Sequence, residues 1–170
     1  MENRKDRGLI GRNNRSNGAA FEQLIDLACR KYEELGIAEI MKVPEPVAVL
    51  GPLDANGRFT ACFTKKAQPD YRGTYRNGQS LLFEAKHTSQ KTVHASIVNE
   101  EQGNRFAVAE RMKACCFVLV SLDFRRYFRI PWAIWKDMKT RFGRACLTET
   151  DMEPYEVKFR RGFLDFLGTS

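Results

Sequence analysis

Two carboxylates and a lysine that could act together on a phosphate lie near the middle of the sequence. Asp70 follows Pro69, and Glu84 and Lys86 lie in the largely apolar segment Leu81–Lys86. Alternate residues of a strand share a face, so Glu84 and Lys86 point the same way, while Asp70 lies just before that strand or on its neighbour. Carboxylate oxygens bind Mg²⁺, and a nearby lysine offsets charge that develops on a phosphate. This spacing indicates the chemistry of a metal-dependent nuclease.

A less specific interpretation of the same residues is a turn aspartate plus a Glu–Lys pair on a solvated strand face. The apolar neighbours of Glu84 favour burial instead, and buried charges are rare unless they are paired or bind a metal. Glu22 lies beside the apolar stripe of an expected helix. It is either a further catalytic carboxylate over the same end of the sheet or an exposed helix residue.

The elements that must position these residues form one α/β domain. Helices are expected from Ser16 or Asn17 to Leu35, over about 99–113 and from Pro131 onward, and strands over 59–64, 81–86, 115–120 and 127–130, with extended chain over 41–50. In the second helix, Phe106, Ala109 and Met112 are expected to face inward. At 170 residues and 43% hydrophobic content, the chain suits one full core better than two.

The first 17 residues have a different composition from the rest. They carry five basic residues, two acidic residues and few apolar ones, so we expect a flexible basic arm over 1–17 and a single domain over 18–170. The arm is either a solvated tail or a segment that touches DNA. In the second case Arg12 and Arg15 are its candidate contacts.

Charge and cysteine content narrow the class of protein. A net charge of +7 and a pI near 9.3 favour a polyanionic partner. The sequence has no apolar run long enough for a membrane span and no signal-peptide pattern. Five cysteines without a Cys-x-x-Cys pair predict reduced thiols in a cytoplasmic protein, and the absence of a phosphate-binding loop predicts no nucleotide cofactor.

Several segments, in this order, carry a resemblance to a known family. They are Asn17–Ile25, Lys42–Val47, Pro69–Tyr75, Phe83–Thr88, Glu101-Gln102 and Cys116–Ser121. The Asp-Tyr-x-Gly and Phe-Glu-Ala-Lys pieces are more specific than a bare acidic motif. Over about residues 15–155 the sequence resembles the RecU family of Holliday junction resolvases, within the PD-(D/E)xK nuclease superfamily.

The resemblance implies a restriction-endonuclease-like fold, with a mixed central sheet flanked by helices and a protruding β-hairpin stalk at about 53–66. It implies a homodimer that uses Mg²⁺, with Mn²⁺ as a substitute, to nick two opposed strands of a four-way DNA junction in recombination and repair. The stalk would enter the junction centre and carry Arg58, Lys65 and Lys66 to the DNA.

The resemblance also assigns roles to single residues. Asp70 and Glu84 match metal ligands, Lys86 matches a lysine that stabilises the transition state, and Gln102 matches a glutamine of the metal site. Gln68 stands where the family has a threonine ligand. Two other functions stay open from the residues alone, namely a restriction- or repair-type nuclease on duplex DNA and a non-catalytic basic DNA-binding protein.

Overall fold

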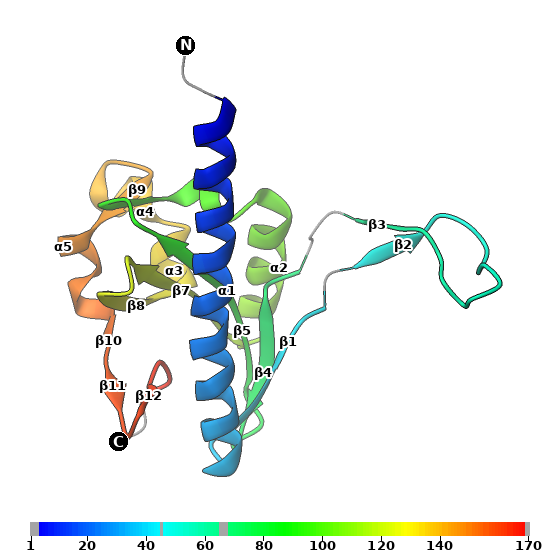
Figure 1. Ribbon diagram of the computed structural model, residues 1–170. Helices are drawn as coiled ribbons and strands as arrows, with labels where there is room; N and C mark the ends of the chain where they lie inside the picture. The colour runs from blue at the N-terminus through cyan, green and yellow to red at the C-terminus, as the bar shows by residue number, and fades with distance from the viewer. Residues whose placement is uncertain (1–3, 45, 65–67, 169–170) are drawn as a thin grey trace.

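A six-stranded mixed sheet forms the centre of the protein (Figure 1). The computed structural model describes the backbone of residues 4–44, 46–64 and 68–168, and the side chains from residue 16 onward except Phe63. The strand order is β1-β4-β5-β7-β8-β10, and only the central β5–β7 pair is parallel. The strands are β1 Ala38–Lys42, β4 Tyr71–Tyr75, β5 Ser80–Thr88, β7 Cys115–Leu122, β8 Arg126–Pro131 and β10 Glu156–Val157. The predicted mixed sheet is confirmed.

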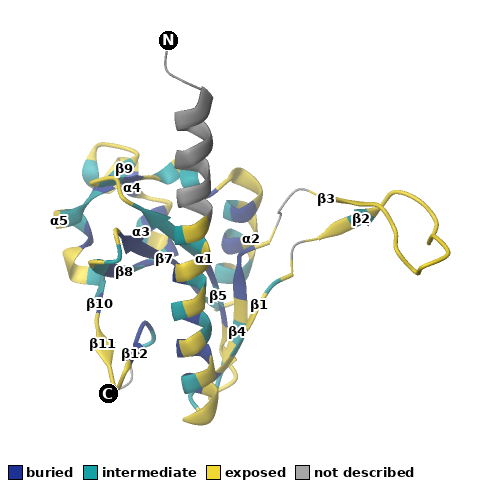
Figure 2. Ribbon diagram, viewed as in Figure 1, coloured by how far each residue is buried: buried dark blue, intermediate teal, exposed yellow. Residues whose placement is uncertain are grey.

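Helix α1, Arg4–Glu34, covers one face of this sheet. Its buried residues recur every three or four positions, the spacing of one helical face, and are Phe21, Ile25, Ala28, Cys29 and Tyr32. Below them the rings of Tyr71, Phe83 and Phe117 stack across β4, β5 and β7, with centroids 4.7 and 4.8 Å apart. Figure 2 shows that buried residues lie in the sheet and along the side of α1 that meets it.

The backbone from Arg4 to Asn17 is helical, so the helix begins well before the predicted start at Ser16 or Asn17, while a flexible basic arm over 1–17 stays a prediction. No proline interrupts this segment, and extension of an existing helix gains a hydrogen bond with each added residue. The side chains of Arg12 and Arg15 lie outside the described part. Despite its 31 residues, α1 is too polar to cross a membrane, and no other described helix is long and apolar enough to do so.

Helix α2, Glu100–Arg111, lies on the other face of the sheet, where Phe106 is fully buried. The single helix predicted after Pro131 is two short ones, α3 Trp132–Trp135 and α4 Met138–Phe142. Met112 is 78% exposed, so its predicted inward orientation is wrong. The remaining elements are β6 Thr92–His94, η1 Ala95–Ile97, β9 Cys146–Thr148, α5 Glu149–Met152, η2 Glu153–Tyr155, β11 Phe159–Arg160 and β12 Phe163–Leu164.

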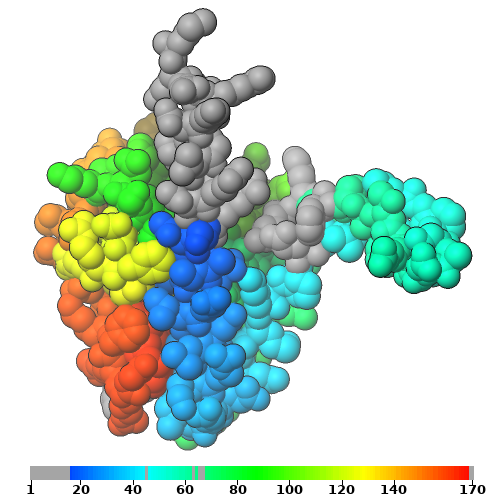
Figure 3. Space-filling view, viewed as in Figure 1, coloured from blue at the N-terminus to red at the C-terminus, as the bar shows by residue number. Residues whose placement is uncertain are grey.

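A β-hairpin protrudes from the body, as Figures 1 and 3 show. It pairs β2, Val47–Val49, with β3, Ala61–Phe63, and a turn in which Asp54 accepts hydrogen bonds from the backbone N–H groups of Asn56 and Arg58 closes its tip. The hairpin therefore begins before the predicted 53–66 range, because β2 precedes the turn and supplies the partner strand. Lys65 and Lys66 lie outside the described residues.

Candidate active site

Strand register brings the two predicted carboxylates together. Tyr71 of β4 is paired with Phe83 of β5 in antiparallel register, so Asp70 lies level with Glu84. The backbone N–H of Asp70 donates to Glu84 Oε2 at 3.1 Å, and the backbone N–H of Ala85 donates to Asp70 Oδ2 at 3.1 Å. Each carboxylate is therefore held by the backbone of the other strand, which fixes their relative position.

Both carboxylates are almost completely removed from solvent. Glu84 has no exposed surface and Asp70 is 5% exposed. Burial, together with the charge of Asp70, raises the pKa of Glu84 to about 7, although the ammonium of Lys86 opposes the rise. The Nζ atom of Lys86 donates to Glu84 Oε1 at 2.6 Å. The site concentrates negative charge in a buried place, which favours a bound proton or a cation.

Gln102, in the first turn of α2, also contacts Glu84 and completes this cluster. Its Nε2 donates to Glu84 Oε1 at 2.7 Å, and its side chain is buried. Its Oε1 accepts from the backbone N–H of Asn99, and its own N–H donates to Asn99 Oδ1. This reciprocal capping box fixes Gln102 as a hydrogen-bond donor to the carboxylate. The role of metal ligand, implied for Gln102 by resemblance, requires its amide to turn and the Asn99 bond to break.

Two other predicted residues lie apart from this cluster. Glu22 of α1 accepts a hydrogen bond from Lys42 Nζ at 2.6 Å, so it reaches the same end of the sheet but pairs with β1. Gln68 is exposed. Among the residues that the structure describes, neither forms a hydrogen bond with the Asp70–Glu84 pair.

A buried tyrosine and a second helix carboxylate adjoin the site and were not predicted. The hydroxyl of Tyr71 donates to Asp26 Oδ1 at 3.0 Å, and burial raises the pKa of Tyr71. Asp26 lies one helical turn after Glu22, and that four-residue spacing was the available signal. Tyr71 follows Asp70 directly, so this bond ties the start of β4 to α1.

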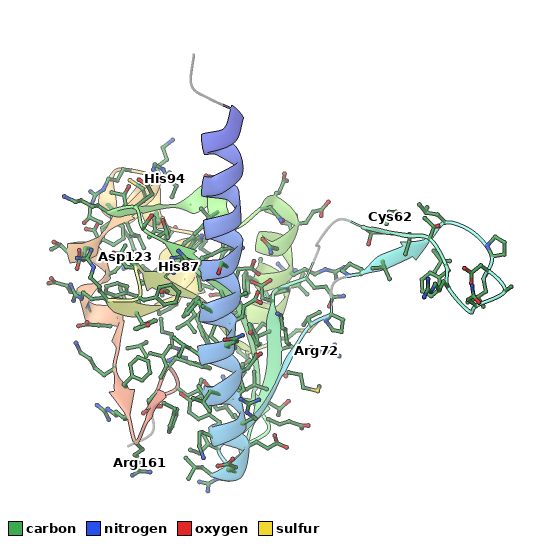
Figure 4. The ribbon with its side chains drawn as sticks, in the orientation of Figure 1. Cys62, Arg72, His87, His94, Asp123 and Arg161 are labelled. Carbon is green, nitrogen blue, oxygen red and sulfur yellow. The ribbon has the colours of Figure 1, made fainter. Side chains whose placement is uncertain are left out.

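His87 points away from Lys86, as strand alternation predicts, and lies on the α1 side of β5. Its Nδ1 is 3.1 Å from Ser121 Oγ, its ring centroid is 4.3 Å from that of Phe124, and burial lowers its pKa. Figure 4 shows His87 and His94 at separate places in the body. Neither histidine joins the carboxylate cluster in the described region.

Asp70 and Glu84 are the residues that could hold a divalent cation. No group of three or more His, Cys, Asp or Glu side chains suited to a metal occurs among the described residues. Two carboxylates with several retained waters nevertheless match the coordination that Mg²⁺ takes in proteins, since this ion dehydrates reluctantly. The donor set fits a hard cation better than Zn²⁺, which prefers nitrogen and sulfur ligands.

Comparison with known proteins supports the assignment of these residues to a nuclease fold. The family model described as "RecU: Recombination protein U" matches residues 16–167. The chain belongs to the RecU family. Proteins named Holliday junction resolvase RecU from Lactobacillus delbrueckii subsp. bulgaricus and Lactobacillus acidophilus are 28% and 27% identical to it. The first match covers 86% of this chain and 73% of the relative, and the second covers 90% and 75%.

Other relatives agree with this membership. A Holliday junction resolvase RecU from Streptococcus equi subsp. zooepidemicus is 32% identical over 110 residues, which cover 62% of this chain and 54% of that protein. The solved structure of Archaeoglobus fulgidus Hjc, described as a Holliday junction resolvase from an archaeal hyperthermophile, superposes with a TM-score of 0.50 and 12% identity. It covers 82% of this chain and 89% of its own. At that identity the likeness concerns the fold alone, and it confirms the restriction-endonuclease-like class.

Proposed function

We propose that this protein is an endodeoxyribonuclease that cuts four-way DNA junctions during recombination and repair. The observation that carries the proposal is the buried Asp70–Glu84 pair with Lys86 bound to Glu84. Membership of the RecU family, whose relatives are named Holliday junction resolvases, supports the choice of substrate. The basic chain, with a net charge of +7, suits a polyanionic partner.

The proposed cofactor is Mg²⁺, with Mn²⁺ as a substitute, held by Asp70 and Glu84. When bound, such an ion polarises a phosphate and lowers the pKa of a coordinated water. Lys86 has a side chain that is 28% exposed, so its ammonium extends from the buried carboxylate toward the surface that DNA would approach. There it offsets the charge that develops on the phosphate. Gln102 holds the Glu84 carboxylate in place.

The proposed partner is branched DNA, bound by a dimer of this chain. Two opposed strands must be cut to resolve a junction, and each copy has one such site. The hairpin, with Arg58 beside its tip turn, would enter the branch point, where phosphates of four arms crowd together. Location in the cytoplasm remains a prediction from the five cysteines.

Competition between two DNA substrates tests the proposal. A labelled four-way junction and a linear duplex of the same arm sequences are mixed with the protein in Mg²⁺, and products are resolved on denaturing gels. We expect paired nicks in the junction, an intact duplex and no cutting in EDTA. Equal cutting of both substrates would favour a restriction- or repair-type nuclease. Binding without cutting in any metal would favour a non-catalytic DNA-binding protein, in which Lys86 only neutralises Glu84.

The hairpin provides a separate test of junction recognition. Arg58→Ala should weaken junction binding more than duplex binding and should lower the log–log salt slope of junction binding by about one, because one phosphate contact is lost. Arg30→Ala on α1 is the matched control, since Arg30 is also exposed. Equal loss of affinity for the junction and the duplex would show that the hairpin binds DNA phosphates without recognising the branch point.

A further inference from the structure

A second hollow lies between β8, β10 and the last described residues, apart from the carboxylate cluster. Its volume is about 280 Å³, and residues from β8, η2, β10, β11 and the segment after β12 line it. Figure 1 shows β10, β11 and β12 together, on the opposite side of the molecule from the β2–β3 hairpin. Pro131, Tyr155 and Phe166 form part of its wall, and no residue of the carboxylate cluster lines it. The hollow is therefore a separate place where a ligand can bind.

Arg129 of β8 presents a fixed positive charge to this hollow. It is the cross-strand partner of Leu119, and its guanidinium lies over the ring of Phe117, with Cζ 4.6 Å from the ring centroid. Its Nη2 donates to Cys115 Sγ at 2.9 Å. Because the ring and the thiol hold the guanidinium in one orientation, an anion would meet a preformed fork of N–H groups.

The same guanidinium has unused hydrogen-bonding capacity. It carries five N–H donors, and Cys115 is the single acceptor for Arg129 within the described residues. The Nε atom is buried and has no partner in that part of the chain. No described carboxylate forms an ion pair with Arg129. Since a thiol is only a weak acceptor, an anion that reaches this partly buried cation would be stabilised there.

Two carboxylates also line the hollow, and both have other partners. Glu156 accepts hydrogen bonds from Arg126 Nε and Nη2 at 2.9 and 3.1 Å, and it pairs with Lys158 Nζ at 2.7 Å. Asp165 accepts a hydrogen bond from the buried hydroxyl of Tyr32 at 3.0 Å. Two cations thus neutralise Glu156, and Asp165 is bound to a hydroxyl. The positive charge of the guanidinium is left for a ligand.

Two further cations line the hollow from the chain that follows β10. Lys158 lies between β10 and β11, and Arg160 ends β11 and is exposed. Arg161 and Gly162 have φ values of 50° and 83° and form the tight turn between β11 and β12. Figure 4 shows Arg161 at the tip of this turn, directed away from the body. Three cations beside two carboxylates that already have partners favour an anion with more than one negative charge.

We propose that this hollow binds a phosphate monoester, with the guanidinium of Arg129 on two phosphate oxygens and the side chains of Lys158 and Arg160 beside the third. A planar guanidinium matches two oxygens of a phosphate, and the two further cations suit its second charge. The volume and the walls of Tyr155 and Phe166 leave room for the organic group that carries the phosphate. Such a group occurs on phosphorylated small molecules and at the 5′ end of a DNA strand. Because the hollow shares no residue with the carboxylate cluster, this site is independent of junction cutting.

Calorimetric titration with inorganic phosphate in EDTA tests the site, because the metal-free carboxylate cluster repels the anion. Wild type should bind one phosphate, and Arg129→Lys, which keeps the charge but loses the fork, should weaken binding at least tenfold. Arg160→Gln, at an exposed side chain, should weaken binding about threefold. Arg161→Gln is the matched control, since it removes the same charge from the next residue, which does not line the hollow. Circular dichroism checks the fold of each variant.

The outcomes of this titration are distinct. A wild type that binds no phosphate, or Arg129→Lys and Arg160→Gln variants that bind as tightly as Arg161→Gln, would overturn the proposal. If Arg129→Lys does not fold, the comparison of Arg160→Gln with Arg161→Gln decides.

Two oligonucleotides of one sequence, with and without a 5′-phosphate, then identify the source of the phosphate. Displacement of inorganic phosphate by the phosphorylated strand alone supports the site and assigns it to DNA ends. If neither strand displaces inorganic phosphate, the site is supported and assigned to a phosphorylated small molecule. Equal displacement by both strands would show binding of phosphodiesters and would overturn the assignment to a monoester.

Discussion

The two faces of the central sheet each carry a buried apolar cluster, but they differ around β4 and β5. The α1 face is a closed apolar layer, in which the stacked rings of Tyr71, Phe83 and Phe117 lie under a helix. The α2 face buries two carboxylates, a lysine contact and an amide, and leaves its outer strands uncovered. Burial stabilises the first face, whereas burial of like charges in the second costs free energy that a bound cation would offset. Successive residues of one strand therefore have different roles, since Phe83 packs in the apolar layer and the next residue, Glu84, belongs to the carboxylate cluster.

Removal of a ring from the α1 face should have the largest effect on stability. Phe83 is fully buried and stacks on both Tyr71 and Phe117. Phe83→Ala should lower the free energy of unfolding by about 3–5 kcal/mol, because it removes apolar contacts and leaves a cavity. Urea denaturation followed by fluorescence measures this change. Phe159→Ala, at a ring that is 51% exposed, is the control. A loss for Phe83→Ala no larger than that of the control would contradict the comparison.

The next residue along the strand should behave in the opposite way. Glu84→Gln should abolish cutting, and it should stabilise the metal-free protein at pH 8, because a buried charge near Asp70 is removed. Thermal denaturation in EDTA measures this gain. Asp70→Asn should act in the same direction. Loss of stability in both variants would mean that the carboxylates serve the fold rather than the chemistry.

The same carboxylate predicts a pH dependence of stability. Glu84 has an ordinary pKa of 4.5 and a pKa of about 7 in the fold, so the folded protein holds this proton more tightly than the unfolded chain. Its contribution to stability is complete below pH 4.5 and is lost as the pH rises to about 7. Melting temperatures in EDTA across this range should fall more steeply for wild type than for Glu84→Gln. Parallel curves would contradict the raised pKa.

A smaller effect is expected where helix α2 meets the site. Asn99→Ala removes the helix cap and should cost about 1 kcal/mol of stability. It also frees Gln102, which should lower the cutting rate by roughly tenfold, as loss of a supporting hydrogen bond commonly does. Asn99→Ser keeps a capping oxygen and should restore both properties. If Asn99→Ala lost stability but kept the full cutting rate, the cap would not position Gln102 for the reaction.

The smallest effect should come from the rim of the α1 face. Lys42→Ala breaks the ion pair between Lys42 and Glu22, whose side chains are 46% and 32% exposed, respectively. An exposed ion pair contributes at most about 1 kcal/mol, and salt screens it. Urea denaturation at low and high salt should therefore give nearly equal values for wild type and the variant. A decrease in the free energy of unfolding of more than about 2 kcal/mol, twice the upper value for an exposed pair, would show that charge also stabilises the α1 face.

The carboxylate pair was predictable from the sequence, whereas its supporting contacts were not. Alternation along an apolar strand predicted the shared side of Glu84 and Lys86, and the stripe on α1 predicted its buried face. Strand β4 was not predicted as such, because Gly73 and the Asn77-Gly78 turn resemble a loop. The bond from Gln102 to Glu84 depends on how α2 docks, which sequence spacing does not determine.

The structure also corrects three predictions for reasons that lie beyond local sequence. Helix α1 extends to Arg4, because a helix formed by packing farther along continues at little cost. The hairpin includes Val47–Val49, since pairing across the tip turn selects the partner strand. Met112 is exposed although it continues the predicted stripe, because α2 ends at Arg111 and Met112 is its C-cap.

Single-turnover cleavage of a labelled four-way junction by wild type and Glu84→Gln tests the central claim most directly. Each protein is mixed with the junction at a protein concentration above both the junction concentration and the dissociation constant of the complex. Mg²⁺ is then added to start the reaction. We expect paired nicks by wild type, none by Glu84→Gln, and equal junction affinity of the two proteins in EDTA, because phosphate contacts elsewhere dominate binding. Cutting by Glu84→Gln at the wild-type rate would contradict this prediction.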